Sequence, residues 1–310
     1  MMAWKWTGIS VRISSVLAVA LTATSGQVMA ATLQIDHVTI AGAHLDALRR
    51  VFTEVSGLPA EYGGPHSNHA TEMALTSFPD GSYLELMGIQ ANADPVAVSM
   101  HVWSRFLQSD GVPCAFAMRV PDVAAEARQL KAVGIVTGKP ESSGRTRPDG
   151  TKLEWQTLDV GPGHRGSLFP FLISDQTRRE LRVYPSGKPS TDRVSGVSKV
   201  VIGVKNLPDE IAQYRRAFGL PAPRLERNIE FRATMAWFEG TPIVLAQGVD
   251  ESSWVTRRVR EYGEAPVAFV LKAGHAAPEV HSKAEHWFSR PVLWLNVKQL
   301  GWRLGLEGGD

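Results

Sequence analysis

The chain has 310 residues, of which 44% are hydrophobic, 21% charged and 8% aromatic, a globular composition with enough apolar material for two compact domains. The formal net charge is only +2 and no basic segment dominates, so charge gives no reason to expect a nucleic-acid partner. The single cysteine, Cys114, excludes an intramolecular disulfide and a cysteine-based zinc site.

Residues 1–30 have the order of a secretory signal peptide. Lys5 and Arg12 are the only charges there, the apolar run 13–20 follows, and Ala30 closes a small-residue cleavage motif. We expect cleavage after Ala30 and a periplasmic or secreted mature protein. The apolar run is short for a bilayer span, so we expect no stable membrane insertion after cleavage; an uncleaved anchor is the alternative.

The next segment reads as one β-α-β-β-β module. A helix over about 44–55 carries its apolar residues on one face and ends before Gly57, a residue typical of helix C-termini. Pro79, Asp80 and Gly81 form a turn signal between the last two strands. The four predicted strands are 33–41, 60–62, 71–78 and 82–89.

The same order then returns. A second module has a helix capped by Asp122 and running to about 132, with strands predicted at 114–120, 151–160 and 168–174. Residues 176–196 are rich in Arg, Pro, Ser and Gly and read as a linker. Residues 31–175 would therefore be one domain, and 197–310 a second, degenerate one.

The second domain would hold a third module and a shortened fourth. The third has a helix that begins near Pro208. The fourth has a weak helix within 278–288. The strands predicted for these modules are 197–204, 231–238, 243–247, 267–272, 292–296 and 301–307.

Two motifs resemble a known superfamily. The run 36–40 (Asp-His-Val-Thr-Ile) before an amphipathic helix, and the run 78–86 at the end of the module, resemble vicinal-oxygen-chelate modules. His66, Thr71 and the run 169–173 are more narrowly similar to the glyoxalase-like domain family, of the glyoxalase, bleomycin-resistance and dioxygenase type. The resemblance implies an α+β fold of cupped mixed sheets, with about four modules in two paired halves and a small-molecule pocket inside a cup.

The resemblance also implies a metal site in many members, with ligands on the first and last strands of a module. Those positions hold His37 and Glu85 here, and imidazole with carboxylate suits a divalent Zn, Mn, Fe or Ni ion. The corresponding positions hold Ala115 and Phe171 in the second module, and Lys199 and Val244 in the third. A complete ligand set is therefore not expected, and the nearest additional donors are His66, His69 and Glu154.

Strand alternation predicts where His37 and Glu85 point. Ile35, His37 and Thr39 would share one face of their strand, and Asp36 would lie on the opposite, aliphatic face. Glu85 would also stand on a mixed face. We therefore expect His37 and Glu85 to meet in one concave site, with their polar atoms within about 5 Å. The alternative is a hydrogen-bonded histidine and an ion-paired carboxylate with structural roles only.

A second group of candidates would bind the substrate. Arg145 and Arg147 lie on a loop that leads into the strand carrying Trp155. Guanidinium groups bind carboxylates or phosphates in a bidentate manner, and an indole face packs on a planar ligand. With His66 these residues form the predicted substrate-binding set; an exposed basic hairpin is the alternative.

These observations lead to two functional hypotheses. The first is an exported glyoxalase-like enzyme with His37 and Glu85 as metal ligands or as catalytic acid–base partners, in a lyase, isomerase or dioxygenase reaction. The second is a non-catalytic protein that binds or sequesters a small molecule in the same cup, which the missing ligands favour. A weaker third is a concave surface that binds another protein. A homodimer is compatible with each.

Overall fold

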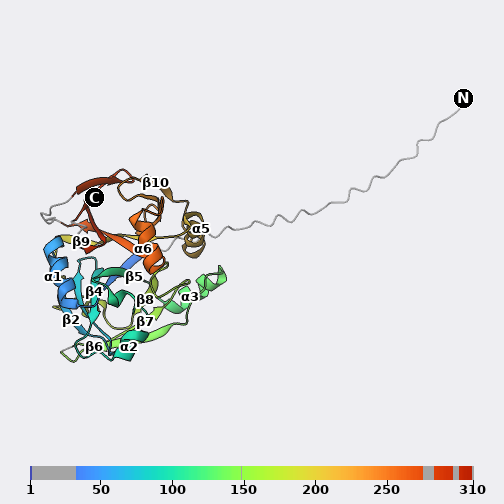
Figure 1. Ribbon diagram of the computed structural model, residues 1–310. Helices are drawn as coiled ribbons and strands as arrows, with labels where there is room; N and C mark the ends of the chain where they lie inside the picture. The colour runs from blue at the N-terminus through green and yellow to red at the C-terminus, as the bar shows by residue number, and fades with distance from the viewer. Residues whose placement is uncertain (2–32, 148, 275–282, 296–299, 309–310) are drawn as a thin grey trace.

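The computed structural model describes residues 1, 33–147, 149–274, 283–295 and 300–308. Nearly all of the predicted signal peptide and part of the predicted fourth helix lie outside this range. Within it, the chain forms two eight-stranded curled sheets with helices packed on them (Figure 1). The predicted α+β class and the repeated modules are therefore confirmed.

The first half contains two modules in the predicted order. A short helix and a 3-10 turn connect them, and one further helix follows the last strand. The elements are β1 (Gln34–Ala41), α1 (Leu45–Ser56), β2 (Glu61–Pro65), β3 (Thr71–Ser77), β4 (Tyr83–Ile89), α2 (Pro95–Met100), η1 (Phe106–Gln108), β5 (Val112–Arg119), α3 (Val123–Ala132), β6 (Glu141–Thr146), β7 (Lys152–Leu158), β8 (Phe171–Asp175) and α4 (Arg179–Val183).

The second half repeats this arrangement. Its elements are β9 (Val194–Gly203), α5 (Leu207–Phe218), β10 (Arg224–Asn228), β11 (Ala233–Trp237), β12 (Ile243–Gly248), α6 (Trp254–Tyr262), β13 (Ala265–Ala273), β14 (Lys283–Trp287), β15 (Arg290–Trp294) and β16 (Arg303–Glu307). None of the helices in the described part of the chain is long and apolar enough to cross a membrane.

Both sheets have the same topology. The first has the strand order β2-β3-β4-β1-β5-β8-β7-β6, and the second has β10-β11-β12-β9-β13-β16-β15-β14. In each module the first and last strands are parallel neighbours, and two modules join through an antiparallel pair of first strands, β1 with β5 and β9 with β13. The concave face of the first sheet is therefore built by both of its modules.

One apolar core connects the two halves. A single cluster of buried side chains includes Phe52 from α1, Phe169 before β8 and Tyr214 from α5. Tyr214 stacks on Phe169 with 4.7 Å between ring centroids, and its hydroxyl donates to the carbonyl of Leu168. Burial of this apolar surface makes the halves parts of one packed body.

Several elements differ from the predictions. The predicted helix within 278–288 is wrong over 283–287, which form β14, and the strand β6 and the helix α6 were not predicted. The segment 176–196, predicted as a linker, contains α4 and the start of β9. Short, polar or mixed segments such as β6 carry little periodic signal, and their strand state comes from pairing with a neighbour.

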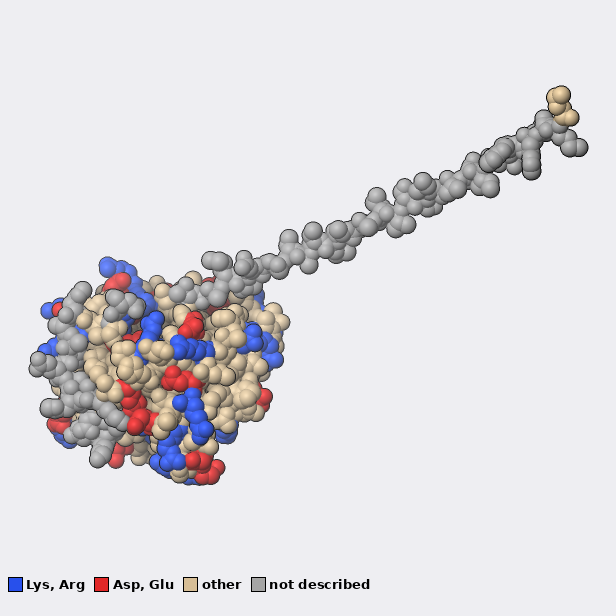
Figure 2. Space-filling view, turned by 90° about the horizontal axis from the view of Figure 1, so that it is seen from above, with Lys and Arg blue, Asp and Glu red and all other residues tan. Residues whose placement is uncertain are grey.

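Figure 2 shows the charged residues on one face of the protein. On the face seen in Figure 2, acidic and basic residues are interspersed and neither sign dominates the part that is described. This agrees with the small net charge of the chain.

Candidate functional site

A cavity of about 250 Å³ lies on the concave face of the first sheet. Side chains of both modules line it, and among them are five residues that the sequence singled out: His37, His66, Glu85, Arg145 and Trp155. The structure therefore brings together residues from strands and loops that are distant in the chain.

A β-bulge at Asp36 changes the predicted face pattern. In the pairing of β1 with β5, Ile35 is opposite Met118 and His37 is opposite Ala117, so Asp36 is an extra residue. Ile35 joins the apolar core with Val38, while Asp36 turns to Arg182, which lines the cavity. The predictions that Asp36 lies on the aliphatic face and that Ile35 shares a face with His37 are therefore wrong, because strict alternation fails at a bulge.

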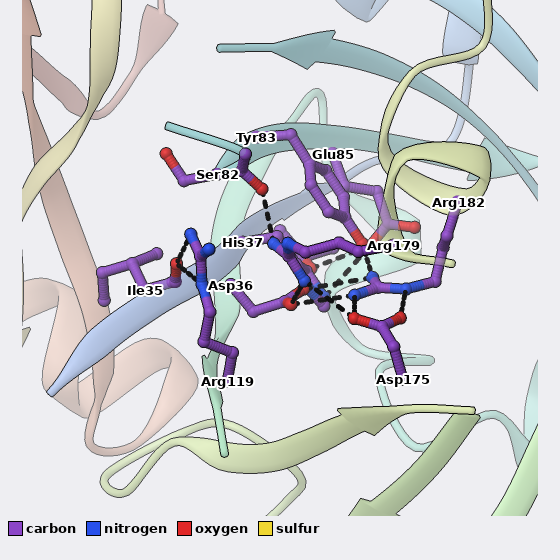
Figure 3. Close-up of polar contacts among 12 residues, drawn as sticks. Ile35, Asp36, His37, Ser82, Tyr83, Glu85, Arg119, Asp175, Arg179 and Arg182 are labelled. Carbon is purple, nitrogen blue, oxygen red and sulfur yellow. Dashed lines mark hydrogen bonds and ion pairs between the residues drawn. The ribbon is translucent and has the colours of Figure 1, made fainter. Parts of the chain in front are cut away.

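Two arginines of α4 bind the buried Asp36 (Figure 3). Arg182 donates to both carboxylate oxygens, at 3.1 and 2.8 Å, and Arg179 donates to one of them. Both arginines also bind Asp175, so two carboxylates and two guanidinium groups form one network. Burial alone would raise the pKa of Asp36, but the charge of Arg182, with His37 and Arg179, holds it well below its usual range. Asp36 is therefore an ionised, fully compensated carboxylate.

His37 is held by its neighbours in one orientation. Its Nδ1 atom lies 2.6 Å from Oδ1 of Asp36, and because an ionised carboxylate only accepts, the hydrogen belongs to Nδ1. The ring stacks on Tyr83 with 4.7 Å between centroids and meets the edge of Phe171 at 5.3 Å. Its Nε2 atom is left facing Oε2 of Glu85 at 4.0 Å.

Glu85 is a buried carboxylate with three polar neighbours. Thr39 donates to its Oε2 atom at 2.9 Å, and Nε2 of His66 lies 3.6 Å from its Oε1 atom. Burial would raise its pKa, but the interactions with His66, His37 and Thr39 together lower the pKa to about 2. Glu85 is therefore ionised at neutral pH inside a largely apolar cup.

His66 joins this pair from the loop between β2 and β3. Its Nδ1 atom is 2.8 Å from the hydroxyl oxygen of Thr71, which fixes the ring with Nε2 toward Glu85. His69 and Glu154, the other two candidates, are exposed and do not line the cavity. Two imidazole Nε2 atoms thus face the two oxygens of one carboxylate.

The two predicted arginines lie in different places. Arg145 lines the cavity and donates to the carbonyl oxygens of Gly63 and Arg182. Arg147 does not line it; its guanidinium donates to the carbonyls of Leu181 and Pro185, and so fixes the segment that carries α4. Arg147 therefore has an anchoring position, which is a correction to its predicted contact with the substrate.

Some residues of the site were not predicted. Arg182 lies in the segment read as a linker, although its spacing of three from Arg179 would have placed both on one side of a helical turn. His101, whose Nδ1 accepts from the backbone N–H of Trp103, and Thr157 also line the cavity. Burial, followed by the charge of His66, lowers the pKa of His101. Nothing in the sequence alone separates these residues from ordinary loop and strand positions.

The donors of the site suit a divalent metal only in part. Two imidazoles with oriented Nδ1 atoms and one ionised carboxylate are chemically appropriate ligands. Yet across the described residues no three His, Cys, Asp or Glu side chains form a group placed to hold an ion. In the structure, His37, His66 and Glu85 form an acid–base cluster in the sense that two imidazoles face one carboxylate.

In the described part of the second sheet, apolar residues stand at the positions that correspond to Thr39 and Glu85. The strand register that pairs Thr39 with Glu85 in the first half pairs Val201 with Val244 in the second. Lys199, which follows the corresponding bulge, forms a buried ion pair with Glu307 at 2.5 Å. Aromatic side chains pack together on this face, including Phe231, Trp237, Trp287, Phe288 and Trp294. The second cup is thus filled by its own side chains.

Comparison with solved structures shows the same fold in other proteins. A hypothetical protein from Staphylococcus aureus is 14% identical, with a TM-score of 0.59 over 89% of this chain and 100% of the other. A variant of 4-hydroxymandelate synthase from Streptomyces coelicolor is 12% identical, with a TM-score of 0.55 over 89% and 92%. The Mn(II)-bound glyoxalase from Novosphingobium aromaticivorans is 10% identical, with a TM-score of 0.53 over 89% and 81%.

Sequence comparison gives the family. No curated protein sequence matches the chain. The glyoxalase-like domain family, however, matches residues 35–221, which include both modules of the first half, α4, and the beginning of the second half. The bulged strand β1, the cavity and the acid–base cluster all lie within this match. The chain therefore belongs to the glyoxalase-like domain family.

Proposed function

We propose that this protein is an exported glyoxalase-like enzyme that acts on a small molecule in the first cup. The observation that carries the proposal is the position of Glu85, whose two oxygens face Nε2 of His37 at 4.0 Å and Nε2 of His66 at 3.6 Å. Each imidazole is oriented by a bond at Nδ1, so three proton-transfer groups are held ready in one cavity.

The cluster supports proton-transfer chemistry at a carbon atom. Glu85 is ionised, so it can accept a proton from a carbon next to a carbonyl, while the electron pair moves onto the carbonyl oxygen. In a 2-hydroxy carbonyl compound, a protonated imidazole of His37 or His66 can give its Nε2 proton to that oxygen, which yields an enediol. Glu85 then returns its proton to the former carbonyl carbon, while the hydroxyl on the first carbon gives its proton back to the imidazole and becomes the new carbonyl. This sequence is an isomerisation; expulsion of a leaving group from the carbanion instead makes it a lyase reaction.

A divalent ion is the second part of the proposal. His37, Glu85 and His66 would hold Zn, Mn, Fe or Ni. The ion would polarise a carbonyl or enediolate oxygen atom, activate a water molecule or, in a dioxygenase, activate dioxygen. The solved Mn(II)-bound glyoxalase of the same fold supports this possibility for the fold. The roles of Asp36 and Thr71 would be unchanged, because both orient an imidazole whether its Nε2 atom meets a proton or a metal.

Export is proposed from the first thirty residues alone. Their charged, apolar and small-residue order is that of a cleaved signal, and the mature chain would begin at Ala31. Intact-mass measurement of the protein from the periplasm or medium tests this: the mass should correspond to residues 31–310. A full-length mass would show that the segment is retained.

The enzymatic proposal is tested by hydrogen exchange. A panel of 2-oxo and 2-hydroxy carbonyl compounds is incubated with the protein in D₂O, and carbon-bound protons are followed by NMR. The wild type should exchange a proton of at least one compound, and His37→Asn should slow this by about 10²–10⁴-fold. Lys199→Met, in the second cup, is the control and should exchange normally. Binding without exchange or turnover would favour the alternative, a protein that sequesters its ligand.

A further inference from the structure

The wall of the cavity opposite the acid–base cluster contains an unpartnered hydroxyl. Thr157, on β7, is 2% exposed, lines the cavity, and its Oγ1 atom has no hydrogen-bond partner. A buried polar atom without a partner is costly, so such atoms normally meet a protein group, water or a ligand. Because this hydroxyl lies at the cavity, a ligand atom is the natural partner.

The same wall carries an arginine without a counter-ion. Arg145 lines the cavity and bonds two backbone carbonyls, but it forms no ion pair in the described part of the chain. The other cavity arginines differ: Arg182 is paired with Asp36 and Asp175, and Arg165 with Asp159 and Glu141. Glu85 acts on the charge of Arg145 only at a distance longer than an ion pair, so an incoming anion would meet a guanidinium that is not bound to a carboxylate.

Strand register places these groups on one face. In the antiparallel pair of β6 and β7, Ser143 is opposite Trp155 and Glu141 is opposite Thr157, while Arg145 lies two residues beyond Ser143. Ser143, Arg145, Trp155 and Thr157 all line the cavity. Residues two apart in a strand share a face, so cation, indole and hydroxyl lie along one face. Arg145 is opposite Leu153, four residues and about 13 Å from Thr157, so the cation and the hydroxyl lie at opposite ends of this face.

The opposite wall has the reverse charge. Glu85 is ionised, and a ligand carboxylate placed beside it would be repelled in a medium of low dielectric constant. Phe171, Met73 and Met87 also line the cavity and, together with Trp155 of the first wall, give it an apolar part. A ligand with one anionic end and an apolar body would therefore be oriented, with its anion at Arg145 and its other end at Glu85.

We infer that Arg145, on the β6–β7 wall, binds the carboxylate of an aromatic or apolar carboxylic acid. This rests on the proposed function only in that both use the same cavity. The guanidinium is planar and suits a carboxylate in a bidentate manner, while the hydroxyl of Thr157, at the other end of the same face, is left for a different polar atom of the ligand. The cavity of about 250 Å³ limits the ligand to a small acid.

A matched pair of probes tests this inference. Binding of 3-phenylpropionate and of its neutral analogue 3-phenylpropionamide is measured by calorimetry, and phenyl phosphate is the third probe. The acid should bind the wild type about 10- to 100-fold more tightly than the amide, because a charge-assisted bond is lost in the amide. Phenyl phosphate should bind more weakly than the acid; tighter binding would overturn the choice of a carboxylate.

Four variants assign the effect to residues. Arg145→Gln should remove the preference for the acid and Arg145→Lys should keep part of it, whereas Thr157→Val should keep the full preference, because 3-phenylpropionate has no second polar group for that hydroxyl. Arg147→Gln is the matched control, since Arg147 also bonds two backbone carbonyls but lies outside the cavity, and it should bind like the wild type. Melting temperatures verify that each variant is folded.

Two results would overturn the inference: equal binding of acid and amide by the wild type, including no binding of either, or full acid preference in folded Arg145→Gln. The result is independent of catalysis, because the assay needs no turnover. Arg145-dependent binding together with exchange that is insensitive to His37→Asn would retain the inference and reject the proposed reaction centre. Binding that does not depend on Arg145, together with exchange that His37→Asn slows, would reject the inference and retain the proposed reaction centre.

Discussion

The Nε2 atom of His37 lies 4.0 Å from the Oε2 atom of Glu85, and the two residues come from the neighbouring parallel strands β1 and β4. Register explains the approach: β1 pairs Thr39 directly with Glu85, and His37 stands two residues away on the same face. Thr39 donates to the carboxylate, and His37 faces it from the side. The expected approach within about 5 Å is therefore observed, whereas the chemical roles of the pair remain proposals.

Acid should destabilise the protein through Glu85. Its pKa is about 2 in the folded protein against an ordinary value of 4.5, so its contribution to stability is complete above about pH 4.5. The contribution is lost as the pH falls toward 2, because the unfolded chain then binds a proton that the folded chain does not. Urea unfolding between pH 6 and pH 3 measures this. Glu85→Gln should show a shallower acid slope than the wild type; an identical slope would contradict the assignment.

Removal of Arg182 should weaken both stability and the orientation of His37. The variant Arg182→Gln leaves the buried Asp36 with only Arg179 as a cationic partner, and loss of one partner of a buried pair typically costs about 3–5 kcal/mol. Arg178→Gln, at an exposed neighbouring position, is the control and should change the free energy of unfolding by less than about 1 kcal/mol.

Two further readouts separate the role of Arg182 in positioning from its role in stability. If Arg182 acts through Asp36 on His37, kcat should fall more than KM changes, and the His37 side-chain NMR resonances should shift. Equal unfolding energies of Arg182→Gln and Arg178→Gln would show that the network is not a major source of stability.

The second cup should contribute to stability and not to ligand chemistry. Lys199→Met breaks the buried contact with Glu307, so the melting temperature should fall. Ligand affinity and exchange in the first cup should stay within about twofold of the wild type, since separate sites without shared partners behave independently. A large loss of binding in the folded variant would show that the second half takes part in the site.

Metal content can be measured directly. Protein purified without chelator is analysed for Zn, Mn, Fe and Ni, then treated with EDTA. If the ion is held by His37 and Glu85, the wild type should contain metal and His37→Asn should not, and removal should lower the melting temperature of the wild type only. Equal metal content in the two proteins would place any ion elsewhere.

Periodicity predicted most of the fold because the helices and central strands pack against a core. Helix α1 buries one face and ends at Gly57, which adopts a left-handed φ of 66°, as expected for that residue. The strand β6, with mixed polar residues, lacks such a signal, and the segment 283–287 (Lys-Ala-Glu-His-Trp) forms a strand through its pairing with β15. Both segments are strands because each pairs with a neighbouring strand, and the local sequence does not reveal that pairing.

The site was predictable where one strand carries a polar residue on a mixed face, as at His37 and Glu85. It was not predictable at Asp36, because a bulge reverses the local alternation, nor at Arg182, because a segment rich in Pro, Gly and Ser hides a single helical turn. Arg145 and Arg147 look equivalent in sequence. The path of the chain around α4 places Arg145 at the cavity, whereas Arg147 donates to the backbone carbonyls of Leu181 and Pro185.

The account depends most on Glu85 as the base of the first cup. The most direct measurement is the rate of solvent-deuterium incorporation, by NMR, into the compound that the wild type exchanges fastest, compared between the wild type and Glu85→Gln. The amide keeps the size and hydrogen-bonding shape of the carboxylate but cannot take a proton, so we predict a rate lower by about 10²–10⁴-fold with the ligand still bound. Exchange by Glu85→Gln at the wild-type rate would contradict the account.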